Sequence, residues 1–163
     1  MVAVLINPTN PALDITRNNI AKAASRLGIH ARFLDVRDFG DIENALQAIR
    51  QSPPDAIQVI ADPFLGGHLE AIVAFARETR LPAMYPFRHG AEAGGLISYA
   101  ADYRDLFRRA AGYIDRIIKG TPLVALPVEY PAKFELLLNI STAKALGLTI
   151  PSSLLARADE VIE

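Results

Sequence analysis

Polar and aromatic residues gather in one glycine-rich stretch near the middle of the chain, residues 85–100. It contains Arg88, His89 and Glu92, followed by the glycine pair 94–95. A loop histidine could act as a general acid or base beside a second positioned group, and an arginine could hold a carboxylate by two hydrogen bonds. Loops of this composition are also common as plain turns above buried aromatic residues. Spacing alone leaves both interpretations open.

Further candidates follow two apolar runs. Asn7 and Asn10 come after the first run, and Asp62 and Phe64 come after another, at residues 56–61. The two asparagines are good turn formers. Asp62 could cap the next helix or form a carboxylate pair with Glu92, and we favour capping. Phe64 and Phe87 suit a pocket lined by aromatic faces, or an ordinary core.

No complete catalytic arrangement emerges from the motifs. The chain has no Gly-x-Gly-x-x-Gly or Gly-x-x-x-x-Gly-Lys-Ser/Thr phosphate loop, and no Gly-x-Ser-x-Gly elbow. His68 and Glu70 lack a second histidine at the helical spacing of a zinc site. We therefore predict no metal, no cofactor and no enzymatic activity, and favour a binding protein.

The composition sets further bounds. The chain has 163 residues, of which 51% are hydrophobic and 21% charged, which is typical of one globular domain. The net charge of −1 without a basic stripe gives no reason to expect a nucleic-acid partner. The absence of cysteine excludes disulfides and thiol nucleophiles. Met1 leads directly into Val2–Ile6 without a positive flank, so we expect no signal peptide in this chain, which would be cytoplasmic if expressed as it stands.

Strand-like runs alternate with helical patterns along the first hundred residues. The predicted strands are 2–6, 29–36, 56–61, 82–85, 96–100 and 134–139. The predicted helices are 14–27, 38–52, 68–79, 102–119 and 142–146, with Ser141 or Thr142 as the cap of the last, and a tail from 150 with some helical character. This alternation predicts an α/β fold with a doubly wound, mostly parallel sheet of five to six strands, like a flavodoxin. Ligands of such sheets bind beyond the carboxyl ends of the strands.

The helix predicted at 102–119 has an unusually wide apolar stripe between Leu106 and Ile118. A stripe of this width needs a partner surface. We expect it to be covered by another copy of the chain in a homodimer, with possible exchange of the C-terminal segment, or to fold back on its own sheet.

Several short motifs, in this order and spacing, together resemble one known family. They are Val2–Pro11, Asp62–Phe64, Glu92–Tyr99, Asp105–Ala111, Pro127–Glu129, Lys133–Leu136 and Thr142–Pro151. The chain resembles, over essentially its whole length, the ABC transporter substrate-binding proteins of the tryptophan/tyrosine type, whose fold is like that of the type I periplasmic binding proteins.

The resemblance implies two α/β lobes that close on a small ligand and deliver it to an ABC permease. Residues 1–101 would be the second, ligand-binding lobe. Residues 102–163 would form a returning segment that completes this lobe or crosses to a first lobe or a partner chain. A first lobe with a signal peptide would precede Met1, and the full-length protein would be a periplasmic or extracellular lipoprotein.

The resemblance also assigns roles to the residues at the strand ends. Asn7, Asn10 and Asp62 would hydrogen-bond polar groups of a small polar solute such as an amino acid, and Glu92 would accept from its amine. Phe64 and Phe87 would pack on its apolar part, with Arg88 as a weaker candidate contact. Members thought to take aromatic amino acids tend to differ from this chain at Asp62–Phe64, which leaves the ligand's identity open. The alternative is a stand-alone flavodoxin-like interaction or regulatory domain without catalysis.

Overall fold

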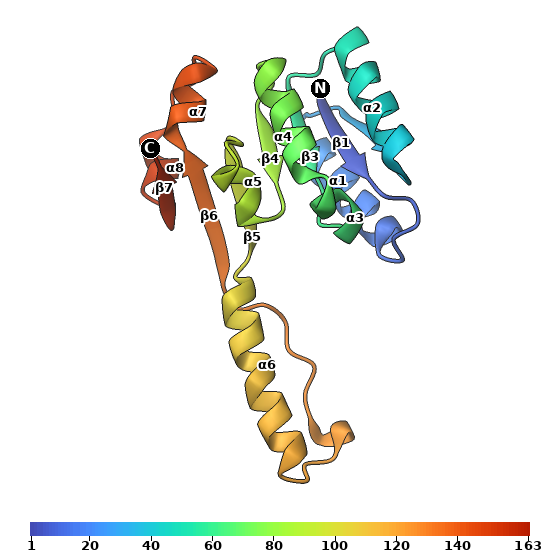
Figure 1. Ribbon diagram of the computed structural model, residues 1–163, viewed down its shortest axis with the longest axis vertical. Helices are drawn as coiled ribbons and strands as arrows, with labels where there is room; N and C mark the ends of the chain where they lie inside the picture. The colour runs from blue at the N-terminus through green and yellow to red at the C-terminus, as the bar shows by residue number, and fades with distance from the viewer.

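Seven strands form a single sheet in the order β2-β1-β3-β4-β5-β6-β7 in the computed structural model, which describes all of residues 1–163 (Figure 1). The strands are β1 Val2–Ile6, β2 Ala31–Asp35, β3 Ala56–Val59, β4 Ala83–Tyr85, β5 Ile97–Ala101, β6 Phe134–Asn139 and β7 Glu160–Ile162. The first five are parallel, β6 runs antiparallel to β5, and β7 is parallel to β6. The predicted fold class is confirmed, with one strand more than expected because the tail ends in β7.

Eight helices connect the strands. They are α1 Leu13–Arg26, α2 Phe39–Gln51, α3 Pro63–Gly67, α4 Leu69–Glu78, α5 Arg88–Glu92, α6 Tyr103–Ile118, α7 Ile140–Ala145 and α8 Ser152–Leu155, with a 3₁₀ turn at Leu123–Ala125. The long helices lie within two residues of their predicted bounds. The short helices α3 and α5 occupy segments expected to be loops. The predicted cap of α7 is wrong, because the side chain of Asn139 accepts from the Thr142 N–H instead.

The core lies between the sheet and helices α2 and α4. Strand β1 is buried on both faces from Ala3 to Ile6, as a central parallel strand requires. The same core cluster includes Ile42 and Ile49 of α2 and Ile72 of α4, all at most 2% exposed. Each such side chain contributes about 1.5–3 kcal/mol to stability by leaving water. This packing fixes where β1, β3 and β4 end, and therefore where their loops meet.

The opposite face of the sheet is covered unevenly. Helix α1 lies over β1 and β2 but has no fully buried residue. Farther along this face, Tyr99 of β5 and Phe134 of β6 stack with ring centroids 5.7 Å apart, and both remain about half exposed. Sequence patterning did not predict this exposed half of the sheet.

Helix α6 projects from the carboxyl edge of the sheet, and the loop that follows it returns alongside (Figure 1). An ion pair between Arg109 and Glu129 and a 2.6 Å hydrogen bond from the Tyr113 hydroxyl to the Pro127 carbonyl hold that loop. The helix has no buried residue, and Ile118 is 79% exposed. The apolar stripe therefore does not fold back on its own sheet, which corrects one of the two expectations for it.

Glycine at position 95 is required by the ring of Tyr85. A β-carbon at Gly95 would lie 2.2 Å from Tyr85 Cε2 and 2.5 Å from the Gly90 carbonyl oxygen, whereas one at Gly112 in α6 would meet nothing within 4 Å. We predict that Gly95→Ala lowers the free energy of unfolding in urea by at least about 2 kcal/mol. Gly112→Ala, the matched control, should raise it by about 0.5–1 kcal/mol. Equal effects would contradict this packing.

Candidate functional site

The carboxylate of Asp62 joins two loops at the carboxyl edge of the sheet. It is 2% exposed and caps α3 by accepting from the N–H groups of Phe64 at 2.9 Å and Leu65 at 3.2 Å. It also accepts from the side-chain amide of Asn10 at 2.8 Å, and from that of Asn7 at 3.2 and 3.3 Å to its two oxygens. Three predicted site residues, Asn7, Asn10 and Asp62, thus lie together, but their side chains bond largely to one another.

The surroundings of Asp62 favour its charged form. Burial alone would raise the pKa of this carboxyl group, but the hydrogen bonds from Asn10, Leu65, Asn7 and Phe64 outweigh burial and lower the pKa below its ordinary value of 3.8. Asp62 is therefore an ionised structural anchor at neutral pH. Its four donor groups leave it little capacity to accept from a ligand.

The two asparagines position this loop, and Asn10 keeps one hydrogen-bond donor free. The side-chain oxygen of Asn7 accepts from the backbone N–H of Thr9 at 3.0 Å and from its hydroxyl at 2.7 Å. The side-chain oxygen of Asn10 accepts from the Ala12 N–H, and one of its two amide hydrogens is used by Asp62. The second amide hydrogen of Asn10 remains available to a ligand.

An aromatic row borders this anchor. The His68 ring centroid lies 4.5 Å from that of Phe64 and 5.8 Å from that of Phe39, which is 54% exposed. His68 Nδ1 lies 2.9 Å from the Phe64 carbonyl oxygen, so in this hydrogen bond Nδ1 carries the hydrogen. In the neutral ring Nε2 is then left as an acceptor.

Phe87 connects the two halves of the edge. Its ring packs on Gly66 of α3, where an added β-carbon would lie 3.1 Å from Phe87 Cε2. On its other side the ring centroid lies 5.7 Å from that of Tyr103, at the start of α6. Phe87 and Tyr103 line a small hollow of about 100 Å³, which Ser98 also lines. The Ser98 hydroxyl is buried and has no hydrogen-bond partner within the chain.

Arg88 lies among three carboxylates rather than in solvent. Its Nε donates to Glu92 at 2.7 Å, and its two terminal nitrogens donate to Glu135 at 3.2 Å and Glu160 at 2.8 Å. Glu92 first, and then Glu160, raise the pKa of Arg88 above its already high ordinary value. The network ties α5 to β6 and β7, and one positive charge faces three negative ones.

The structure divides the predicted site residues into two groups. Asn7, Asn10, Asp62 and Phe64 form one group around the anchor, and Arg88 and Glu92 form the other, with Phe87 between them. Sequence reasoning missed four residues of this edge: Phe39, His68, Ser98 and Tyr103. Only the position of Tyr103, directly after a strand and a capping aspartate, gave a usable signal.

The edge offers binding groups rather than a reacting pair. His89 lies 3.4 Å from Glu70, but both side chains are more than half exposed. No three His, Cys, Asp or Glu side chains are grouped to hold a metal ion. No helix is both long and apolar enough to cross a membrane. Aromatic and amide groups thus lie at the carboxyl edge of the sheet, which is where α/β folds of this class bind their ligands.

The family follows from comparison with known proteins. The family described as ABC transporter substrate binding protein matches residues 1–162, and the chain belongs to it. It is thus a member of a family of solute-binding proteins. A comparison with curated proteins gave no significant match.

Solved structures share the fold of this chain. A conserved domain protein from Vibrio cholerae is 25% identical, with a TM-score of 0.89 over 98% of this chain and 54% of its own. An ABC domain from Streptococcus pneumoniae in complex with L-Trp is 24% identical, with a TM-score of 0.89 over 99% of this chain and 56% of its own. A ligand-free, open substrate-binding protein from Clostridium difficile is 17% identical, with a TM-score of 0.69 over 99% and 54%. The chain spans about half the length of these proteins.

The anchor predicts a specific dependence on pH. Because the folded-state pKa of Asp62 is below 3.8, its stabilisation is complete above that value and is lost as the pH falls through the lower folded-state pKa. We expect Asp62→Asn to lower the free energy of unfolding at pH 7 by about 1–3 kcal/mol, because an amide nitrogen then faces other donors. The loss of stability below pH 4 should also be shallower in this variant.

Asp115→Asn is the matched control, since Asp115 forms an exposed pair with Lys119. It should leave both the stability and its pH profile nearly unchanged. An Asp62→Asn protein as stable as the wild type, with an unchanged acid profile, would contradict the role of Asp62 as an anchor.

Proposed function

We propose that this chain is the solute-binding lobe of an ABC-type importer, non-enzymatic, and that its carboxyl edge forms one wall of the binding cleft. The observation that carries the proposal is the convergence of three separate loops at that edge around Asp62 and Phe87. Family membership supports solute binding over a stand-alone regulatory domain.

A small polar solute such as an amino acid suits the groups that remain free. The spare amide hydrogen of Asn10 can donate to a carboxylate, and Nε2 of His68 can accept. The rings of Phe64 and Phe87 offer apolar faces. Glu92 keeps one oxygen free of Arg88, and three carboxylates around one guanidinium leave an excess of negative charge that favours an amine.

Delivery to a membrane permease is the next part of the proposal. Solute-binding proteins of ABC importers act outside the inner membrane, so the working protein would be periplasmic or an extracellular lipoprotein. The similar solved proteins are about twice as long as this chain, and the V. cholerae and S. pneumoniae structures match it closely in fold. We propose that a second α/β lobe forms the opposite wall of the cleft, reached by way of β5, α6 and β6.

The projecting helix carries a related proposal about assembly. The stripe on α6 includes Phe107 at 75% exposure and Ile114 at 57%, with Leu123 and Val124 of the next turn exposed beside it. In this chain on its own, we propose that a second copy covers the stripe in a homodimer. Apolar surface of this extent favours association in water.

A one-walled site predicts weak binding by this chain alone. One wall desolvates only one side of a ligand, so we expect dissociation constants in about the millimolar range or weaker for single amino acids in isothermal titration calorimetry. The same lobe joined to a second lobe should bind its solute far more tightly. Micromolar binding by residues 1–163 alone would contradict the two-walled cleft.

Acidic substitutions in the apolar stripe of α6 test the proposed homodimer. We predict that Ile114→Asp with Ile118→Asp converts a dimer into a monomer in sedimentation velocity, because two carboxylates cannot be buried unpaired at an interface. Asp115→Asn, which changes a charge on the same helix but keeps the apolar stripe, should leave the dimer intact. A wild-type chain that sediments as a monomer would overturn this part of the proposal.

A further inference from the structure

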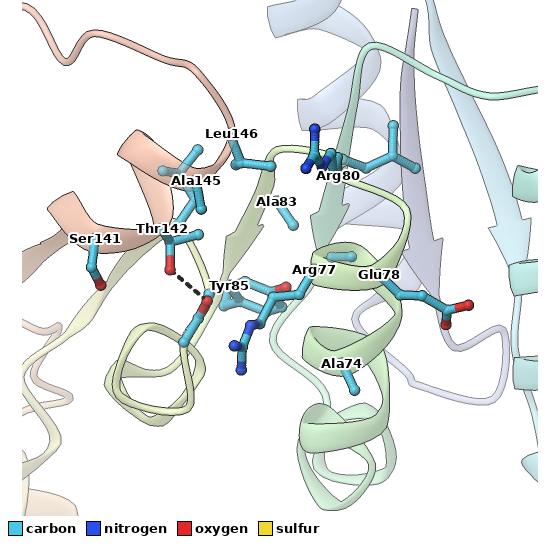
Figure 2. Close-up of a pocket in the computed structure, with 15 residues that line it drawn as sticks. Ala74, Arg77, Glu78, Arg80, Ala83, Tyr85, Ser141, Thr142, Ala145 and Leu146 are labelled. Carbon is cyan, nitrogen blue, oxygen red and sulfur yellow. Dashed lines mark hydrogen bonds between the residues drawn. The ribbon is translucent and has the colours of Figure 1, made fainter.

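A cavity lies at the edge of the sheet opposite the proposed cleft. Helices α4 and α7 stand apart across the amino ends of β4 and β5, and leave a hollow of about 650 Å³, here called the amino-edge hollow (Figure 2). This volume lies within the range of about 300–1,000 Å³ that is typical of small-molecule sites. None of the residues predicted for the cleft lines it.

The floor of the hollow is apolar and fixed in place. Leu81, Ala83 and Leu96 line it from the sheet side, and Leu146 lines it from the α7 side. Tyr85 lies between two glycines: β-carbons at Gly90 and Gly95 would come within 2.4 and 2.2 Å of its side chain. The ring therefore cannot shift without moving α5 or the turn after it. A rigid floor of this kind suits the apolar body of a ligand.

The Tyr85 hydroxyl has no partner. The side chain is 1% exposed, and its oxygen forms no hydrogen bond within the chain. Burial raises the pKa of this phenol, so the hydroxyl keeps its hydrogen at neutral pH. An unsatisfied buried hydroxyl costs about 1–3 kcal/mol. A group bound in the hollow that accepts from Tyr85 would remove this cost.

Two arginines border the hollow without a carboxylate partner. Glu78, the one acidic residue of the lining, pairs instead with Arg50 at 2.9 Å. Arg77 lies against Gly94, where an added β-carbon would be 3.3 Å from one of its terminal nitrogens. Figure 2 shows the guanidinium groups of Arg77 and Arg80 on different sides of the hollow, with Tyr85 between Arg77 and Thr142. The hollow therefore carries uncompensated positive charge beside an apolar floor.

We propose that the amino-edge hollow binds a small organic carboxylate with an aromatic or branched apolar body. Arg77 or Arg80 holds the carboxylate through paired N–H donors. The apolar body packs on Leu81, Leu96 and Leu146, and the Tyr85 hydroxyl donates to an acceptor on the ligand. This site is separate from the proposed cleft, and neither needs the other.

The test is a titration of the isotopically labelled chain with indole-3-acetate, followed by amide chemical shifts. We expect saturable shifts at Gly94, Gly95 and Leu96 and at α7, all of which lie at the amino-edge hollow, and none at the carboxyl edge. Tryptamine, which has the same ring with an amine in place of the carboxylate, should not produce them. Arg77→Gln with Arg80→Gln should weaken binding at least about tenfold. Arg26→Gln, which changes the last turn of α1, is the matched control and should have no effect.

Tyr85→Phe gives an independent readout. Removing the unpartnered hydroxyl should keep or raise the stability of the free chain, yet weaken indole-3-acetate binding several-fold. The proposal is overturned if no saturable shifts occur up to about 10 mM probe, well above ordinary weak affinities. It is also overturned if the shifts lie at the Asn10 and His68 edge, or if the arginine variants and Arg26→Gln bind alike.

Discussion

A single buried carboxylate organises the carboxyl edge of this lobe. Asp62 lies in the turn after β3, caps α3 and accepts from Asn7 and Asn10 after β1, so that one charge fixes two loops and one helix start. Packing of β1 and β3 between α1 and the helices α2 and α4 brings these groups into reach. The hydrogen bonds that stabilise the charge also use up its acceptor capacity. The anchor therefore shapes the carboxyl edge, and in the proposed function its neighbours supply the contacts to the solute.

Phe87 connects the Asp62 anchor to the rest of the carboxyl edge. Its ring packs on Gly66 of α3 and lies beside Tyr103 at the start of α6. The same ring therefore helps to position both helices. Beyond it, Arg88 fastens α5 to β6 and β7 through three carboxylates. The edge is rigid where it holds these elements, and α6 leaves it toward solvent. Fixed side chains at this edge and an uncovered helix beside it fit the proposal of a cleft between two lobes.

Much of the fold could be predicted from local patterns, and less of the site. Apolar runs and caps such as Asp102 predicted the long elements, because burial and capping act over a few residues. Two of the three partners of Arg88 could not be predicted, since Glu135 and Glu160 are far away in the sequence and meet it only through the β5–β6–β7 pairing. Helix capping was the favoured prediction for Asp62. Its hydrogen bonds to Asn7 and Asn10 could not be predicted, because they depend on how β1 and β3 are aligned in the sheet.

Phe87 lies at the centre of the proposed solute-binding wall. Amide chemical shifts of the labelled chain, recorded with a pool of the twenty common amino acids and then with single ones, test it most directly. We expect weak, saturable shifts at Asn10, His68 and Phe87, which a Phe87→Ala variant with an otherwise native spectrum loses. Shifts that avoid this edge, or that persist unchanged in the variant, would contradict it.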